Sequence, residues 1–255
     1  MQETSKAGDL SDLHDWRFDV DIEQIAWAIF DREGESANSL GQRPLEELGR
    51  IVEHVEANAG DLAGLVIMSV ITNSYGNMVS SFFGAKFGKH IEELLISPLP
   101  NWVILAGYVT GALVRGLMVG AVVMLVSLFF TRIDVQYPLI MFSVLLLTAV
   151  VFALAGMVNA IYAQKFDDIA IIPTFVLAPL TYLGGVFYSI SLLPEFWQKV
   201  SVFNPILYMV NGFRLGMLGV SDVGLGLTYG VIGAAGLLLF TWCMILLHRG
   251  TGLRT

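Results

Sequence analysis

The residues whose spacing comes nearest to a catalytic motif are the glycines and lysines of GAKFGK, at positions 84–89. In a phosphate-binding loop, G-x-x-x-x-G-K-[ST], backbone N–H groups cradle the phosphates and the last hydroxyl binds Mg²⁺. Here Gly84 and Gly88 are one residue too close, and His90 stands where the hydroxyl is needed. The lone Cys243 can build neither a disulfide framework nor a thiolate metal site. The sequence therefore predicts no ATP hydrolysis, no catalytic residue and no metal ligands in this chain.

A charge inside an apolar run is the second candidate. Arg115 follows Gly107 and Gly111 at intervals of four residues. A guanidinium left in lipid costs on the order of 3 kcal/mol or more, so we expect Arg115 to face protein or water. Two interpretations stay open: Arg115 lines a path through the membrane, or it ties two helices together. Small residues at this interval also let helices pack closely, within one subunit or across a dimer, and the pairs are Gly107 with Gly111, Gly116 with Gly120, and Gly226 with Gly230.

Prolines interrupt another apolar run. Pro173 and Pro179, followed by Gly184 and Gly185, predict a kinked or broken helix whose freed carbonyls need protein or water as partners. Such a break either lines a path or is a static kink in a packed bundle. The short turn before it holds three charged residues to which we assign no chemistry: Lys165, Asp167 and Asp168.

The elements that must position these residues are membrane helices. Hydrophobic residues make up 55% of the 255 residues, and the mean hydropathy is +0.69. A helix needs about 20 apolar residues to cross a bilayer. Five runs meet this length: Leu62–Phe83, Val103–Phe130, Pro138–Ala163, Ile169–Ile190 and Gly226–Leu247. The segment Ser191–Leu225 is too mixed to span, and we expect it to pack at the membrane interface.

The distribution of charge predicts two parts and an orientation. Residues 1–61 hold 15 acidic and 5 basic residues, whereas residues 62–255 hold 7 and 9. We expect two domains with these boundaries, the first soluble and incomplete, the second transmembrane. Basic residues resist translocation, which places one set of loops and the C-terminus in the cytosol. That set is Lys86, Lys89, Lys165, Arg249 and Arg254, against Arg132, Lys199 and Arg214 on the other side. Five crossings then put residues 1–61 outside, although no signal peptide precedes them, so one crossing is missing.

The acidic part reads as the opening of an α/β domain. Residues 16–30 alternate as two strands of a hairpin, a helix capped by Ser39 follows, and LAGLVIMS at 62–69 is a third strand-like run. This order, WRFDVDIEQIAWAIFDREGESANSLGQRPLEELGRIVEHVEAN and then LAGLVIMS, resembles the start of a crotonase (enoyl-CoA hydratase) domain over about residues 16–69. The family's oxyanion and acid/base residues lie beyond that point, so none is carried over. The fold expected overall is mainly α, a five-span bundle after a truncated α/β segment.

An amphipathic elbow, Gly84–Pro100, separates the first two spans. Apolar residues at intervals of three and four alternate with charged ones, and Pro98 and Pro100 end the pattern. The elbow is either an ordinary helix in the headgroup region or a helix that docks a partner. Its apolar residues are Phe87, Ile91, Leu94, Leu95 and Pro98, and its charged ones are Lys86, Lys89, Glu92 and Glu93.

From about Ile67 the chain resembles the membrane subunit of a bacterial ABC exporter of the ABC-2 type. The resemblance rests on IMSVITNSYGNMVSSFFGAKFGKHIEELLISPLP and on FDDIAIIPTFVLAPLTYLGGVFYSISLLPEFWQKVSVFNPILYMVNGFRLGMLG. It implies six spans, with the first span missing here, a homodimer in the bacterial inner membrane, and a separate cytosolic subunit that binds ATP and Mg²⁺. It also implies that the coupling helix maps onto Gly84–Ser97.

The function this resemblance implies is export of a lipophilic, lipid-linked, saccharide or drug-like substrate through this permease. The composition gives no sign of a nucleic-acid partner. The alternative is a membrane-anchored or non-functional fusion that carries a hydratase fragment. Such a hydratase would need carboxylates and an oxyanion site after the third strand-like run, and the sequence has neither there.

Overall fold

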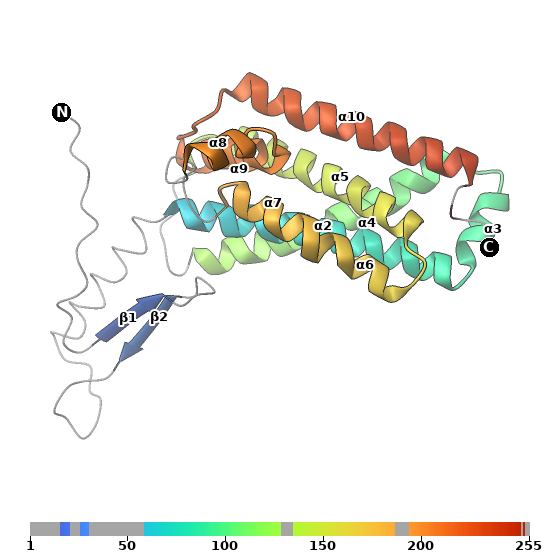
Figure 1. Ribbon diagram of the computed structural model, residues 1–255, viewed down its shortest axis with the longest axis horizontal. Coiled ribbons are helices and arrows are strands. Elements are labelled where there is room, and N and C mark those ends of the chain that lie inside the picture. The colour runs from blue at the N-terminus through green and yellow to red at the C-terminus, as the bar shows by residue number, and fades with distance from the viewer. Residues whose placement is uncertain are drawn as a thin grey trace. The chain divides into compact units, whose positions relative to one another are not determined.

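The computed structural model describes residues 16–20, 26–30, 59–128, 135–186, 194–250 and 252. It divides into two compact units, one with the N-terminal strands and one with the helices (Figure 1). In the first unit, β1 (Trp16–Val20) pairs antiparallel with β2 (Ala26–Phe30), so that Trp16 lies opposite Phe30. The predicted hairpin is confirmed. The helix expected after Ser39 lies outside the described residues.

The prediction that LAGLVIMS forms a third strand is wrong. These residues belong to α2 (Ala59–Phe87), a helix of 29 residues. A short apolar run does not by itself distinguish a strand from a buried helix. Here the run continues for another four turns with buried residues on one side, so the helix satisfies its backbone hydrogen bonds within lipid.

Five helical stretches are long and apolar enough to cross a membrane, which confirms the predicted number. Among the described residues between the spans, shorter helices follow the first span and the fourth span. The candidate spans are Leu62–Phe87 within α2, α4 (Asn101–Ser127), α5 (Pro138–Tyr162), Phe166–Leu183, and α10 (Leu225–Arg249). The fourth consists of α6 (Phe166–Ile172), the π-helical segment η1 (Pro173–Leu177) and α7 (Ala178–Leu183).

The spans α2 and α5 form the centre of the helical unit. About half of each is buried, whereas the other three spans are 11–22% buried. Glycine allows the two central helices to approach closely, because a Cβ at Gly156 of α5 would meet the Tyr75 carbonyl oxygen of α2 at 2.7 Å. Close packing of this kind replaces the hydrophobic driving force that lipid does not supply between helices.

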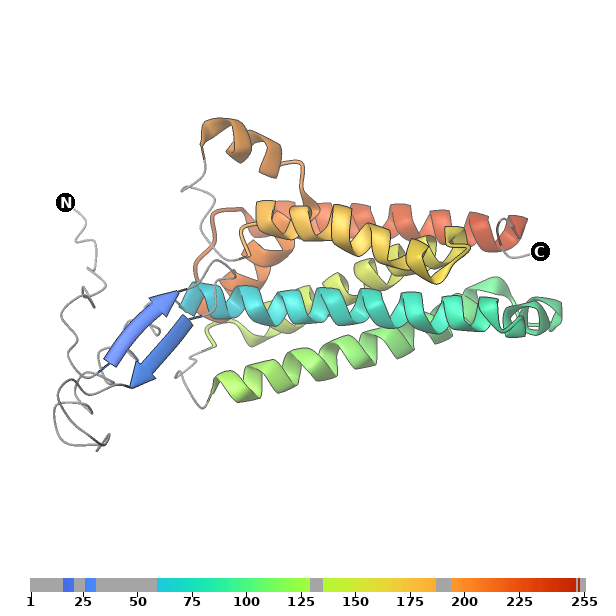
Figure 2. The ribbon, with the colours of Figure 1, turned by 60° about the horizontal axis from the view of Figure 1, so that its bottom comes forward.

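The mixed segment Ser191–Leu225 folds largely into the bundle. Its helices are α8 (Glu195–Ser201) and α9 (Pro205–Leu218). The Asn204 side chain accepts a hydrogen bond from the Ile206 N–H at the start of α9, and Gly219 ends α9 with a φ of 76°. Ten residues of α9 are buried, and the helix packs against α5 and α10. The expected position at the membrane interface stays a prediction, and the structure adds that α9 is buried against other helices. In Figure 2, α8 alone stands away from the long helices.

The two ends of the bundle differ. The short helix α3 (His90–Ile96) and the C-terminal end of α10 lie at one end, and α8 and α9 lie at the other (Figures 1 and 2). This arrangement agrees with the predicted orientation, in which the elbow and the C-terminus share one side of the membrane.

Candidate functional site

The elbow is a helix break followed by a second short helix. The chain leaves α2 at Phe87 and turns at Gly88 and Lys89 before α3 begins. Lys89 has a φ of 59°, in the left-handed region, and its N–H donates to the Lys86 carbonyl at 3.0 Å. The predicted amphipathic helix is thus divided in two, while its predicted end before Pro98 agrees with the end of α3.

The apolar side of the elbow packs largely on the chain itself. Ile91 is 1% exposed and joins a buried cluster with Phe82, Phe83 and Leu105. Leu94 is half-buried, whereas Phe87 is 65% exposed. The side chains of Glu92 and Leu95 lie outside the described residues. Of the predicted apolar stripe, Ile91 is therefore part of the core of the helical unit rather than an outward contact.

The outward surface of the elbow includes residues that the sequence analysis missed. Ile96 is 84% exposed, and His90 is exposed between Lys89 and Glu93, which are exposed as well. The signal for Ile96 was present in the sequence, because an apolar residue three positions after Glu93 falls on the charged side of the helix. We call Phe87, Lys89, His90, Glu93 and Ile96 the elbow surface.

Lys86 connects the elbow to the end of α5. Its Nζ donates hydrogen bonds to the carbonyl oxygens of Ile161 and Ala163, both at 2.6 Å. These carbonyls lie at the C-terminal end of α5, where helix carbonyls lack partners and a cation is favourable. Phe166, at the start of α6, packs on Phe83 and Phe87 with ring centroids 5.1 and 5.0 Å apart. The elbow and the turn between α5 and α6 therefore form one connected structure.

The charged turn before α6 has a structural role. A carboxylate oxygen of Asp168 accepts from the backbone N–H groups of Gln164 and Lys165, at 2.8 and 2.9 Å. It caps the start of α6, and Lys165 and Asp167 are exposed. These contacts are those of a helix cap, and none of them indicates catalysis.

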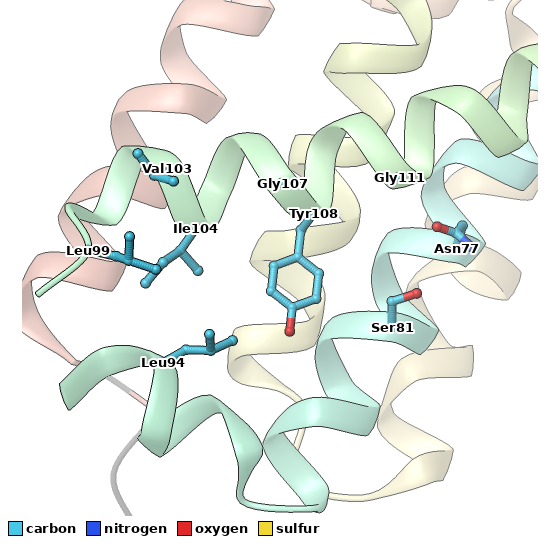
Figure 3. Close-up of a pocket in the computed structure, with 9 residues that line it drawn as sticks. All are labelled: Asn77, Ser81, Leu94, Leu99, Val103, Ile104, Gly107, Tyr108 and Gly111. Atoms are coloured by element: carbon cyan, nitrogen blue, oxygen red, sulfur yellow. The ribbon is translucent and has the colours of Figure 1, made fainter. Parts of the chain in front are cut away.

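A groove of about 360 Å³ opens between α2, α3 and α4, beside the elbow. Figure 3 shows the Tyr108 side chain pointing from α4 into this space, with the amide of Asn77 and the hydroxyl of Ser81 on α2 near it. Leu94 of α3 closes one end. The lining residues are Asn77, Ser81, Leu94, Leu99, Val103, Ile104, Gly107, Tyr108 and Gly111.

The structure places the predicted glycine pairs in different surroundings. A Cβ at Gly116 or Gly120 would clash with Ser74 or Val70 of α2, so this pair serves packing within the chain. Gly107 and Gly111 have no such neighbour within 4 Å and line the groove instead. Gly226 and Gly230 on α10 are also open. The sequence analysis missed a further packed pair, Gly212 and Gly216 of α9, which approach α5 and α10.

Arg115 is exposed on the surface of α4, one turn beyond Gly111. Among the described residues it has no hydrogen-bond or ion-pair partner. The structure therefore brings Arg115, Gly107 and Gly111 onto one open face. Pro173 and Pro179 are not among the residues that line the groove.

The two prolines flank a change of helix type. Pro173 begins the π-helical segment, and Pro179 follows it in α7. π-Helical turns arise where the regular hydrogen-bond ladder is interrupted, which proline causes by lacking an N–H. This agrees with the predicted interruption of the fourth span. In the described part of the chain, no cluster of His, Cys, Asp or Glu could hold a metal, and Cys243 is buried on α10.

The helical unit thus combines long apolar helices around two central ones with an amphipathic elbow at one end. Beside the elbow lies an open groove, mostly apolar but with polar groups from Asn77, Ser81 and Tyr108. These are the features of a multi-pass membrane transporter subunit. Residues 25–218 match the sequence model of the ABC-2 type transporter family. This match covers most of the chain, and the chain belongs to the ABC-2 type transporter family.

Several curated proteins are similar to this chain. The inner membrane transport permease YadH of Escherichia coli K12 is 55% identical over 192 residues, which cover 75% of each chain. Nodulation protein J of Rhizobium leguminosarum bv. viciae is 25% identical over 182 residues, covering 71% of this chain and 70% of that protein. Nodulation protein J of Sinorhizobium fredii is 27% identical over 168 residues, covering 65% and 63%.

The crotonase resemblance finds no support in these matches. The match to the transporter family begins at residue 25, within the segment that was compared with a hydratase. Members of this family are typically non-catalytic transmembrane subunits, in agreement with the prediction that this chain is not an enzyme.

Proposed function

We propose that this chain is the permease subunit of an ATP-driven exporter in a bacterial inner membrane, and that a separate cytosolic subunit binds and hydrolyses ATP. The observation that carries the proposal is the elbow surface. It presents Phe87 and Ile96, 65% and 84% exposed, at the end of the bundle predicted to be cytosolic. Exposed apolar residues surrounded by charged ones are typical of a surface that docks a partner.

The docking surface proposed here differs from the apolar stripe predicted from the sequence. Ile91 is the anchor of α3 on the permease, whereas Ile96 and Phe87 are available to a groove in the ATP-binding subunit. Lys89 and Glu93 flank them with opposite charges, which favours a defined orientation of docking. The proposed coupling helix is therefore α3 together with the last turn of α2.

A movement of the docked elbow is transmitted to the membrane helices by two connections. One is the continuous α2, and the other is the Lys86 contact with the end of α5. The path for substrate is proposed along Arg115, Gly107 and Gly111, with the Pro173 and Pro179 segment as a place where the fourth span can bend. The working unit is a homodimer, and the cargo is lipophilic, lipid-linked, saccharide or drug-like.

Residues 1–61 are proposed to be a separate segment that takes no part in transport. The alternative function inferred from the sequence, a membrane-anchored fusion with a hydratase fragment, has no support from the family match, and residues 62–69 of the resemblance belong to α2. It predicts enoyl-CoA hydration by the full chain, which the transporter function does not.

A docking experiment tests the proposed function. The full chain is reconstituted in lipid nanodiscs with the ATP-binding subunit encoded beside it, and association and ATP hydrolysis are measured. We expect Ile96→Asp to weaken association roughly tenfold or more, because it places a charge in an apolar contact. Val220→Asp, at the opposite end of the bundle and also exposed, is the matched control. Equal association of wild type and Ile96→Asp, or no association with any such subunit, would contradict the proposal.

A further inference from the structure

One face of α2 is polar along several turns although α2 is a membrane span. Opposite its buried side, α2 presents hydroxyl, amide and glycine positions at intervals of three and four residues. These are Thr72, Asn73, Gly76, Asn77, Ser80 and Ser81, of which the two asparagines are half-buried and the others exposed. Polar groups in contact with hydrocarbon are costly unless water, protein or a ligand satisfies them. The sequence gives no structural need for so many of them on one side of a span.

Some of these groups are already satisfied by the helix backbone. The Asn73 amide donates to the Ser69 carbonyl at 2.9 Å, and the Ser80 hydroxyl donates to the Asn77 carbonyl at 3.1 Å. Within the described chain, the side chains of Asn77 and Ser81 form no hydrogen bond. Both line the groove beside the elbow (Figure 3). Two unengaged polar groups therefore face an open space at membrane depth.

Arg115 lies one turn beyond the groove, toward the middle of α4. Ile104, Tyr108 and Gly111 line the groove from α4, and position 115 continues their spacing of four, three and four residues. The packing of α4 on α2 fixes this register, because Gly116 lies against Ser74 and Gly120 against Val70. Arg115 does not itself line the groove, but it is exposed one turn beyond Gly111, and this register places it between the levels of Asn73 and Asn77 of α2.

We propose that this face binds the head of an anionic amphiphile, a molecule with a phosphate or carboxylate and at least one alkyl chain. Arg115 donates to the anion, and Asn77 and Ser81 donate to its other oxygens. A guanidinium matches a phosphate or carboxylate geometrically and is stabilised by a counter-charge in a low dielectric. This inference rests on the proposed transport function and adds to it the charge of the cargo.

The alkyl part of the ligand has a place outside the groove. Beside Arg115, the surface of α4 carries Val114 and Met118, which are 49% and 61% exposed and suited to contact with lipid. In the proposed complex the alkyl chain remains in the bilayer beside these residues while the head follows the polar face of α2. A cavity of about 360 Å³ accommodates the head and the first carbons of a chain.

The test is competition for a photoreactive ligand. The full chain in nanodiscs of phosphatidylcholine, without ATP or partner subunit, is labelled with a dodecyl phosphate that carries a diazirine in its alkyl chain. Mass spectrometry locates the adducts. Unlabelled dodecyl phosphate, dodecyl maltoside and dodecyltrimethylammonium then compete, so that only the head group differs between competitors.

We expect adducts on α2 and α4 around the groove, and competition by dodecyl phosphate alone at low concentration. Arg115→Gln should raise the concentration of dodecyl phosphate needed for half-competition roughly tenfold, since a hydrogen bond to a charged group is lost. Arg115→Lys should bring the half-competition concentration most of the way back to that of the wild type. Asn77→Leu should raise it by an intermediate amount. Arg249→Gln, the same change at an exposed arginine at the end of α10, is the matched control and should behave as wild type.

Three results would overturn the inference. The first is unchanged half-competition in Arg115→Gln, and the second is equal competition by the neutral maltoside. The third is efficient disulfide cross-linking between two copies of the Ser81→Cys variant, which would show that a second copy covers the groove. Selective labelling without any ATPase docking would support this site while refuting export, whereas docking without selective labelling would refute only this site.

Discussion

At the scale of single residues, the sequence pattern does not tell which of two isoleucines is buried. Ile91 and Ile96 are both on α3, but one is 1% and the other 84% exposed. We predict that Ile91→Asp lowers the yield of folded permease, because a buried unpaired charge costs several kcal/mol. Ile96→Asp should leave folding unchanged. Fluorescence-detected size-exclusion chromatography of both variants measures this, and an Ile91→Asp protein that elutes like wild type would contradict the buried position.

Lys86 provides a second prediction at this scale. Lys86→Met keeps most of the alkyl stem but removes the two hydrogen bonds to the end of α5. We expect a loss of about 1–3 kcal/mol of stability, since hydrogen bonds from charged groups are stronger than neutral ones. The Tm of the detergent-solubilised chain should fall, whereas Lys89→Met, at an exposed lysine in the same elbow, should change it little. Equal Tm values for the two variants would show that the contact with α5 does not stabilise the fold.

At the scale of elements, glycines predict which helix contacts are close. In a helix, Gly→Ala normally stabilises by roughly 0.5–1 kcal/mol. At Gly230 of α10 there is no atom within 4 Å of a Cβ, so we predict this ordinary gain. At Gly216 of α9 a Cβ would lie 2.5 Å from the backbone nitrogen of Met141, and Gly216→Ala should destabilise instead. Thermal unfolding of both variants gives the sign of each change in stability. An increase in Tm for Gly216→Ala would mean that α9 and α5 are further apart than in this structure.

The elements also show what the sequence could and could not predict. The five spans were predictable because a bilayer requires a minimum number of apolar residues. The burial of α9 was not, since its 14 residues fall short of a span and its apolar residues look like those of an interfacial helix. The Arg115 side of α4 was identified from spacing, but the polar face of α2 was missed because hydropathy averages over all sides of a helix. Whether the Ile91 side chain points into the bundle or outward depends on the angle between α2 and α3, which the sequence does not give.

At the scale of the whole molecule, the two ends of the bundle give a topology prediction. Cysteine at Ile96, on α3, should react with a membrane-impermeant maleimide only from the cytosolic side, and cysteine at Val220, between α9 and α10, only from the outer side. The native Cys243 is buried and should react slowly. Intact cells and inside-out vesicles provide the two conditions. Labelling of both positions from one side would show that the number of crossings between them is even.

Residues 1–61 give the last prediction at this scale. If this segment takes no part in transport and carries no hydratase, the purified full chain should not hydrate crotonyl-CoA above the rate without protein. Hydration that persists after Ile96→Asp and is lost when residues 1–61 are removed would support the alternative function instead.

The short buried helix α9 also constrains how the protein is made. At about 1.5 Å per residue its 14 residues extend about 21 Å, less than the hydrocarbon thickness of about 30 Å. The insertion machinery therefore has no reason to release α9 sideways into lipid as a span. One of its two partners, α10, is synthesised after it. During translation α9 can pack on α5, which is made before it, but the side of α9 that contacts α10 stays uncovered until α10 has entered the membrane. A ribosome that stalls between residues 218 and 225 thus leaves an exposed apolar segment for membrane proteases, which makes completion of α10 a checkpoint in biogenesis.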